Sequence, residues 1–244
     1  MEDQPFPSVW TRPRRSGRAQ PALSREQIVA EALRLLDSEG IEALSMRRLG
    51  AALNAGATSI YSHVSNKDEL IELVIDEVYG EVEVPEITDP SAWREAAGAL
   101  ARELRATILR HPWIISVLDE LGLSYMGPKL MNLSEGMLNL FEAAGFGLVE
   151  ADQAGKFLLG YVLGTASTEA AVLTRLARTG WDERAWSESV RAAATALVRT
   201  HPRMSALYAA QEHREPDEFR ESSFTYGLER ALDGLEIRLR ALRS

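Results

Sequence analysis

Apolar residues recur at helical spacing along nearly the whole chain. One stripe runs from Ile28 to Leu36 and another from Leu70 to Val78. After a linker, the helical pattern continues over residues 112 to about 121, 128 to 144, 150 to 178, 183 to 199, 202 to 213 and 216 to 241. No segment shows a convincing strand pattern, and no internal repeat is visible. The sequence therefore predicts an all-α fold.

The stretch from Leu44 to His63 predicts two short helices joined by a tight turn. Ser45 can cap the first helix, and residues 54–56 (Asn-Ala-Gly) are the types that a short turn favours. In the second helix Ile60 faces inward, while hydroxyl, phenol and imidazole side chains around it face solvent. Such a face is a poor core but suits a groove lined with phosphates and base edges. We therefore expect a helix-turn-helix that binds DNA.

A linker by composition, residues 81–92, divides the chain. Before it, Ser24 and Gln27 form a capping box that opens the first helix. After it, Asp89 as cap and Pro90 at the first helical position start the next helix. We expect a disordered basic arm over residues 1–22, an N-terminal three-helix helix-turn-helix domain over 23–80, and a larger C-terminal helical ligand-binding and dimerisation domain over 90–244.

The N-terminal arm has two interpretations. Residues 1–22 hold four of the ten prolines and four arginines, with almost no apolar periodicity. The segment is either a solvated tail or a basic arm that reaches along the DNA backbone or into a minor groove.

Composition and charge narrow the class of protein. The 244 residues include no cysteine, which excludes disulfides and thiolate metal sites and fits a cytoplasmic protein. The net charge of −9 is uneven, because arginines crowd the N-terminal quarter and the acidic excess follows Lys67. No signal peptide is visible, and the longest charge-free apolar run, between Lys156 and Glu169, is shorter than the roughly 20 residues of a membrane span. We expect no membrane partner.

Two long helices dominate the expected C-terminal domain. The segment Phe157–Ala166 is apolar nearly all round, so it should be buried on more than one side, and Gly160 and Gly164 would let another helix approach closely. The last helix carries apolar residues from Phe224 to Leu239 at spacings of three and four. The two helices form either the core of this domain or half of a four-helix dimer interface. Helix-turn-helix proteins usually cover a site with two copies, which favours the dimer.

A family resemblance rests on two motifs. Residues 57–70 (ATSIYSHVSNKDEL) resemble the signature of the tetracycline-repressor (TetR) family of bacterial transcriptional regulators, and residues 44–49 (LSMRRL) match its preceding helix. More loosely, residues 104–113, 143–146 and 161–164 are similar to the ligand-binding domain of the tetracycline-repressor branch.

The resemblance implies a homodimeric repressor that binds a palindromic double-stranded operator and is released by a small-molecule effector. It places these residues at the DNA: Ser45, Arg47, Thr58, Ser59, Tyr61, Ser62, His63 and Lys67. By this analogy Arg47 reaches a guanine edge, and Tyr61, His63 and Lys67 hold phosphates. Gly56 and Ala57 depart from the pattern, because neither has a side chain able to read a base.

Each of these roles has a structural alternative. The Tyr61 ring could pack on the first helix as part of the core, and His63 could be a surface residue without a role. Arg48 is interpreted as a solvated residue and not as a base reader.

The expected effector is small and largely apolar, and its pocket should lie between C-terminal helices. For any one of the candidate lining residues, ordinary core packing is the preferred explanation: Trp113, Tyr125, Met126, Met131, Met137, Phe141, Phe157, Tyr161 and Thr165. Tetracycline repressors bind a magnesium chelate of the drug through histidine. His111 falls in a comparable region, but its position before a proline fits a residue at a helix end. We expect no metal and no cofactor.

Enzyme motifs are not found. The four histidines lack the spacing of a metal-binding helix, and no nucleophile elbow or phosphate-binding loop is present. Three hypotheses remain, in order: an effector-released DNA-binding repressor, a helical ligand- or partner-binding protein without DNA binding, and an all-α enzyme.

Overall fold

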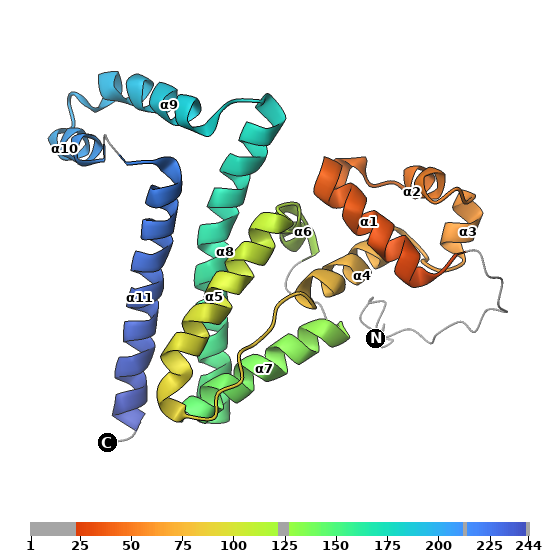
Figure 1. Cartoon of the computed structure of the whole chain (residues 1–244), viewed down its shortest axis with the longest axis horizontal. Helices are drawn as coiled ribbons and strands as arrows, with labels where there is room; N and C mark the ends of the chain where they lie inside the picture. The colour runs from red at the N-terminus through yellow and green to blue at the C-terminus, as the bar shows by residue number, and fades with distance from the viewer. Residues whose placement is uncertain (1–22, 122–126, 212–213, 243–244) are drawn as a thin grey trace, which may run out of the picture. The chain divides into compact units, whose positions relative to one another are not determined.

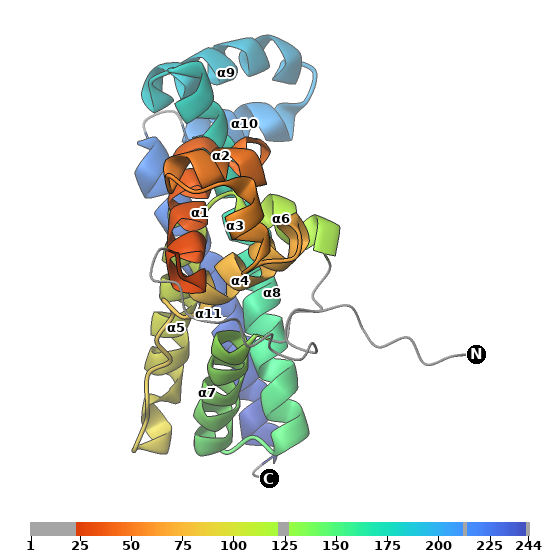
Figure 2. The same ribbon diagram turned by 90° about the vertical axis from the view of Figure 1, so that its right-hand side faces the viewer.

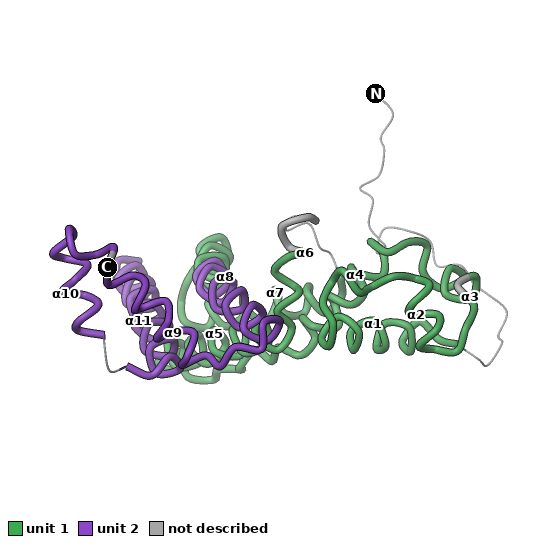
Figure 3. The backbone as a smooth tube through the Cα atoms, turned by 90° about the horizontal axis from the view of Figure 1, so that it is seen from above, with its two compact units in different colours: residues 1–159 green, residues 160–244 purple. Residues whose placement is uncertain are grey.

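The computed structural model describes residues 23–121, 127–211 and 214–242. By its internal contacts the chain divides into two compact units, residues 1–159 and 160–244 (Figure 3). Every regular element among the described residues is an α-helix or a short 3-10 helix, so the predicted all-α fold is confirmed. The arm expected over residues 1–22 lies outside the described part, and the three expected domain ranges remain predictions.

The first unit begins with a compact group of helices. These are α1 (Arg25–Glu39), the 3-10 turn η2 (Ile41–Ala43), α2 (Met46–Ala52), α3 (Ala57–Tyr61) and α4 (Lys67–Tyr79) (Figure 1). Helix α1 packs on α2 and α4, and α2 packs on α3. Their shared core contains Ile28, Leu49 and Ile60, each with 0% of its surface exposed. Burial of these apolar side chains is the main force that holds such short helices together.

The capping box predicted at Ser24 is confirmed, and Gly40 and Asn66 mark two further helix ends. Ser24 Oγ accepts the Gln27 N–H at 3.2 Å, and the Gln27 side chain accepts the Ser24 N–H at 2.9 Å. Gly40 ends α1 with φ of +80°, a conformation that strains other residues. Asn66 caps α4 by accepting the Glu69 N–H at 2.7 Å. Local caps of this kind fix where each helix of the group starts and stops.

Four further helical elements complete the first unit. They are the 3-10 turn η3 (Pro90–Ala92), α5 (Trp93–Arg110), α6 (Ile114–Leu121) and α7 (Pro128–Ala144), followed by the first residues of α8 (Leu148–Thr179). Helix α7 packs on both α4 and α5. Trp93, Phe141 and Phe146 form a cluster with ring centroids 5.9–6.5 Å apart. Helix α5 ends directly before His111, as predicted.

The second unit contains α8 from Gly160 onward, α9 (Glu183–Val198), α10 (Pro202–Ala210) and α11 (Pro216–Leu242) (Figure 2). The Tyr161 hydroxyl of α8 donates to the Phe224 carbonyl of α11 at 2.6 Å, and the two rings lie 5.6 Å apart. A Cβ at Gly227 would lie 2.5 Å from the Tyr161 hydroxyl oxygen, so a glycine is needed for this close approach. These contacts join α8 and α11 into one pair of helices.

The apolar segment of α8 differs from expectation. Leu158, Val162 and Ala166 are fully buried on one side. Phe157 is 53% exposed, and a Cβ added at Gly160 or Gly164 would meet no atom within 4 Å. The prediction that Phe157–Ala166 is buried on more than one side is therefore wrong for the single chain.

By length and composition alone, α8 could cross a membrane, and it is the one helix in the described part of the chain with this property. Core helices of soluble proteins pass the same test, so this is weak evidence of insertion.

Candidate functional site

The surface of α2 and α3 presents polar side chains around a buried anchor. Ile60 and Val64 are 0% and 1% exposed and hold α3 in place. Thr58, Ser59 and Ser62 lie exposed on the same short segment. Tyr61 is 51% exposed, which argues against the alternative that its ring belongs to the core. The outward orientation expected from the sequence is therefore observed.

Two neighbouring arginines of α2 have different surroundings. Arg48 pairs with Glu39 at the end of α1. Arg47 is exposed and has no hydrogen-bond or ion-pair partner within the described part of the chain. Arg47 is thus available to an external partner, and Arg48 is already engaged.

Other candidate residues also have roles inside the protein. Ser45 caps α2 by accepting the N–H of Arg48 at 3.3 Å. The carbonyl of His63 accepts a hydrogen bond from the Arg25 guanidinium at 3.1 Å, and Lys67 Nζ lies 3.4 Å from the Ile41 carbonyl. These contacts fix the ends of the short helices and leave the DNA-binding roles of the three residues as predictions.

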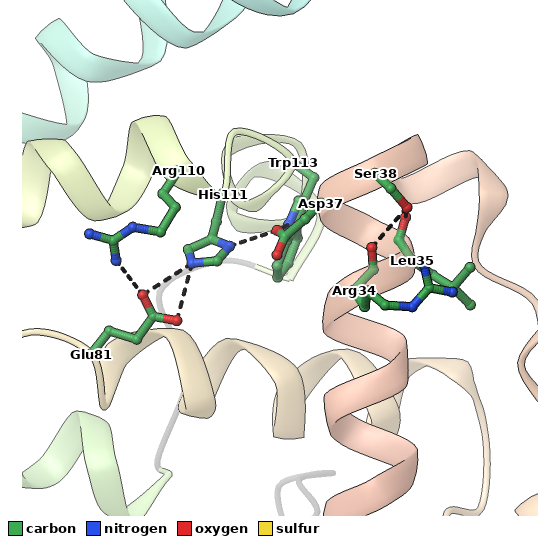
Figure 4. A network of polar contacts seen from close by, with 8 residues as sticks. All are labelled: Arg34, Leu35, Asp37, Ser38, Glu81, Arg110, His111 and Trp113. Carbon is green, nitrogen blue, oxygen red and sulfur yellow. Dashed lines mark hydrogen bonds and ion pairs between the residues drawn. The ribbon is translucent and has the colours of Figure 1, made fainter. Parts of the chain in front are cut away.

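A polar cluster centred on His111, which is only 3% exposed, lies between α1 and the end of α5 (Figure 4). Its Nδ1 lies 2.6 Å from Asp37 Oδ1, and its Nε2 lies 3.1 Å from Glu81 Oε2. Trp113 Nε1 donates to the same Asp37 oxygen at 2.8 Å, and Arg110 pairs with Glu81. Because carboxylates only accept, both histidine contacts are hydrogen bonds when each ring nitrogen carries a proton. The cluster joins α1 to the end of α5.

A second polar contact joins α4 to α7. Asp76 is 6% exposed, and its Oδ1 accepts the N–H groups of Lys129 and Leu130 at 3.0 and 3.1 Å. Burial raises the pKa of the Asp76 carboxyl, although these two N–H groups act in the opposite direction. Gly127 allows the approach, because a Cβ there would lie 2.0 Å from Asp76 Oδ1. Asp76 therefore caps the start of α7 from another helix.

A cavity of about 580 Å³ lies in the second unit. Residues from four helices and the segment before α11 line it: Gly164, Thr165, Thr168, Glu169 and Val172 of α8, Glu183, Trp186, Ser187, Val190 and Arg191 of α9, Tyr208 of α10, Gln211, Arg214, and Pro216, Phe219, Arg220, Ser223 and Phe224 of α11. Its volume and mostly apolar lining are those of a small-molecule site. Another hollow, of about 590 Å³, lies in the first unit between residues 79–87 and α7.

The structure does not bring the expected effector residues together. Thr165 lines the cavity of the second unit. Phe141 and Trp113 are buried in the first unit, whereas Phe157 and Met131 are 53% and 46% exposed.

Two further expected residues have local partners, and two cannot be placed. Met137 lies against Gly155 and Tyr161 against α11. Tyr125 and Met126 lie outside the described residues. Among the described residues, no group of histidine and acidic side chains is arranged to hold a metal ion.

Sequence reasoning missed several residues of this cavity. Trp186 and Tyr208 lie on the amphipathic helices α9 and α10, and no motif distinguishes them from other half-buried aromatic residues. Arg220 was missed because its partners Glu169 and Glu183 are 51 and 37 positions away. A long-range ion pair of this kind leaves no local signal in a sequence.

Similarity to known proteins covers most of the chain. Residues 28–74 match the family model "Bacterial regulatory proteins, tetR family", and residues 85–239 match "Tetracyclin repressor-like, C-terminal domain". An HTH-type transcriptional regulator of Saccharopolyspora erythraea is 40% identical over 163 residues, which are 67% of this chain and 68% of the relative. The HTH-type transcriptional repressor DrrR1 of Streptomyces coeruleorubidus is 34% identical over 232 residues, covering 94% of this chain and 83% of the repressor.

The fold is also similar to that of solved regulators. The TetR family protein ActR of Streptomyces coelicolor, in its complex with actinorhodin, superposes with a TM-score of 0.73 at 30% identity, covering 88% of this chain and 96% of ActR. Its complex with (S)-DNPA gives a TM-score of 0.71 at 30% identity, covering 89% and 99%. The family models, the curated relatives and the helix-turn-helix together identify the chain as a transcriptional regulator that belongs to the tetR family of bacterial regulatory proteins.

Proposed function

We propose that the chain is a cytoplasmic, homodimeric repressor without enzymatic activity, which binds a palindromic operator and leaves it when a small molecule binds the C-terminal domain. The observation that carries this proposal is the outward polar face of α2 and α3. Thr58 and Ser59 are exposed above the buried Ile60, and Arg47 beside them is unengaged within the described chain. Exposed donors on a short helix suit the edges of bases in a major groove.

The proposed dimer is supported by two exposed stripes in the second unit. The α8 stripe consists of Gly160, Gly164, Thr168 and Ala171, and the α11 stripe consists of Phe219, Ser223, Tyr226, Arg230, Gly234 and Ile237. Both follow the three- and four-residue spacing of helix-packing seams. Tyr226 and Ile237 are each 68% exposed, which is costly for large apolar side chains in water. A second copy that packs on the stripes would bury them in a four-helix interface.

The proposed effector response is supported by the cavity of the second unit and by ActR, which has been solved with two different small molecules. In a symmetric dimer the two α3 helices would enter grooves about 34–36 Å apart, one turn of the duplex. An effector would act by favouring a different spacing of these helices.

A gel shift with DNA from upstream of the chain's own gene tests the proposal. Binding should weaken steeply as salt rises, because phosphate contacts release counterions. Arg47→Ala should cost about 1–3 kcal/mol of operator binding and relax the preference for one base. Arg48→Ala is the matched control. It removes the same charge from the neighbouring residue, but the Arg48 side chain already pairs with Glu39.

Two results would count against the proposal. Equal losses of operator affinity for Arg47→Ala and Arg48→Ala would show that Arg47 does not contact a base. No shift at low salt would favour a helical ligand- or partner-binding protein that does not bind DNA.

A further inference from the structure

The hollow of the first unit lies between residues 79–87 and one face of α7, and its volume is about 590 Å³. It shares no lining residue with the cavity of the second unit. The linker touches α7 closely at Gly136, where a Cβ would lie 2.9 Å from Val84 Cγ2. Leu133 and Leu140, which are 4% and 2% exposed, also line the hollow. The packing of the linker on α7 therefore creates this hollow.

The hollow is lined by hydrogen-bonding groups that the fold leaves unused. Asn132 and Asn139 are exposed, lie about one turn before and after Gly136, and have no hydrogen-bond partner among the described residues. Tyr79 likewise has no partner in that part of the chain, although tyrosine hydroxyls that are largely buried usually have one. Burial raises the pKa of the Tyr79 hydroxyl to about 12, so it stays protonated and can donate. Two amides and a phenol around one space favour a guest with free carbonyl groups.

The charge at the edge of the hollow is negative. Lys129, the one cation among the described lining residues, already pairs with Glu77. Glu86 lines the hollow and is exposed, and Glu83 of the same linker is exposed too. Neither carboxylate has an ion-pair partner within the residues that the structure describes. A positively charged guest would compensate these carboxylates, and an anion would be repelled.

The N-terminal arm of the same chain carries this chemistry. Residues 1–22 contain four prolines and four arginines, against two acidic residues. Residues 12–15 (Arg-Pro-Arg-Arg) combine a proline with three of these arginines. Proline-rich segments favour the polyproline II conformation, whose carbonyls form no internal hydrogen bonds and which docks in grooves lined by aromatic side chains. The arm thus offers both the carbonyls and the positive charge that the hollow favours.

The arm is long enough to reach the hollow. Arg25, in the first turn of α1, lies 3.9 Å from Glu69 in the first turn of α4. Tyr79 ends the same helix ten residues later, which is about 15 Å further on. The ten residues from Arg15 to Arg25 span up to about 33 Å when extended. The arm can therefore reach the hollow while α1 keeps its observed position.

We propose that residues 12–15 dock in the hollow between the linker and α7 when the protein is free of DNA. An arginine of the arm pairs with Glu86, and the amides of Asn132 and Asn139 and the hydroxyl of Tyr79 donate to backbone carbonyls of the arm. The contact is autoinhibitory, because arginines held in the hollow are withheld from the phosphates of DNA. Only this competition rests on the proposed function, since docking itself requires no DNA.

The test uses the full-length protein with a single dye on the arm. The chain contains no cysteine, so Ser16→Cys gives one attachment point directly after the docking residues. Docking restricts the local rotation of the dye and raises its fluorescence anisotropy. In this labelled background we expect the double variant Asn132→Leu and Asn139→Leu, which removes both amides, to lower the anisotropy. Glu86→Lys, which reverses the charge, should lower it as well.

Glu142→Lys is the matched control for Glu86→Lys. It makes the same charge reversal at an exposed position of α7 that does not line the hollow, and it should leave the anisotropy unchanged. All the substituted residues are exposed, and far-UV circular dichroism should show the helix content of the wild type for every variant.

A gel shift measures the competition with DNA. The double asparagine variant should bind DNA about three- to tenfold more tightly than the wild type, because the arginines of its arm are free to contact phosphates. This variant is the suitable one for the gel shift, since it changes no charge, whereas Glu86→Lys would attract DNA by its charge alone.

Several results would overturn the inference. Equal anisotropy in the wild type, the double asparagine variant and Glu86→Lys would show that the arm does not dock in the hollow. An equal fall for Glu142→Lys would show that the arm responds only to the overall surface charge. Lower anisotropy with unchanged DNA affinity would overturn the autoinhibition. If no variant binds DNA, the proposed function fails and the competition with it, while the anisotropy still decides whether the arm docks.

Discussion

The N-terminal helices have two faces whose polar residues are used in opposite ways. On the reading face, formed by Arg47, Thr58 and Ser59, the side chains are exposed. On the rear face, Asp76 accepts hydrogen bonds from another helix, and His111 joins two carboxylates from different segments. The rear face is where α1 and α4 of this group contact His111, which follows α5, and the start of α7.

The contrast separates binding from positioning. A polar group left in solvent adds little to stability, but it can form bonds with an external partner. A polar group that forms a hydrogen bond with a buried partner fixes the position of the two segments that carry them. Its removal leaves the buried partner without a hydrogen bond. Changes on the rear face should therefore lower the free energy of unfolding, and changes on the reading face should lower only the affinity for DNA.

The largest stability effect is expected at Asp76. Asp76→Ala leaves the N–H groups of Lys129 and Leu130 without their acceptor at the start of α7, which should cost about 2–3 kcal/mol of the free energy of unfolding. Asp76→Asn keeps one oxygen acceptor and should cost less than about 1 kcal/mol. Urea titration of both variants gives the two values, and equal losses would show that the carboxylate does not act as a cap.

The stabilities of the wild type and of Asp76→Asn should also depend on pH in different ways. Burial raises the pKa of Asp76, so the native state holds this proton more tightly than the unfolded chain does. Stability from this group is present at low pH and is lost as pH rises through the raised pKa. The wild type should therefore gain stability relative to Asp76→Asn as the pH is lowered from neutral to mildly acid. The opposite slope would contradict the raised pKa.

A smaller loss is expected at His111. His111→Ala removes the contacts with Asp37 and Glu81, but these carboxylates are 33% and 31% exposed and can turn to water. We expect a loss of about 1–2 kcal/mol, measured by thermal and urea unfolding. His201→Ala is the control, because His201 is exposed at the start of α10 and should change stability by less than about 0.5 kcal/mol. Equal losses for His111→Ala and His201→Ala would show that the contacts of His111 with Asp37 and Glu81 do not stabilise the fold.

The smallest stability effect is expected on the reading face. The double variant Thr58→Ala and Ser59→Ala removes exposed hydroxyls and should change the free energy of unfolding by less than about 0.5 kcal/mol. Operator affinity should nevertheless fall in a gel shift. A large loss of stability with unchanged affinity would reverse the assignment of the two faces.

Features that depend on neighbouring residues could be predicted from the sequence. The Ser24 capping box, the Asn66 cap and the end of α5 at His111 all follow from residues within four positions of one another. The helix-turn-helix was predictable for the same reason, since Ile60 and the turn before it mark its inner side.

Features that depend on distant residues could not be predicted. Asp37 and His111 are 74 positions apart, and Asp76 and Leu130 are 54 apart, so no local pattern pairs them. The effector pocket was placed among apolar residues of the right type, but residue type does not say which side chains share a cavity. The exposed side of α8 was misjudged because an apolar sequence cannot distinguish burial within one chain from a surface left for another molecule.

Helix α1 has a mechanical consequence for the way this regulator reads DNA. At one end Arg25 holds the carbonyl of His63, directly after the five-residue helix α3, and at the other end Asp37 contacts His111. About 18 Å of unbroken helix separates these two contacts, at 1.5 Å per residue. Since α3 is too short to keep its own orientation, the contacts at the two ends of α1 would link the position of α3 to that of His111.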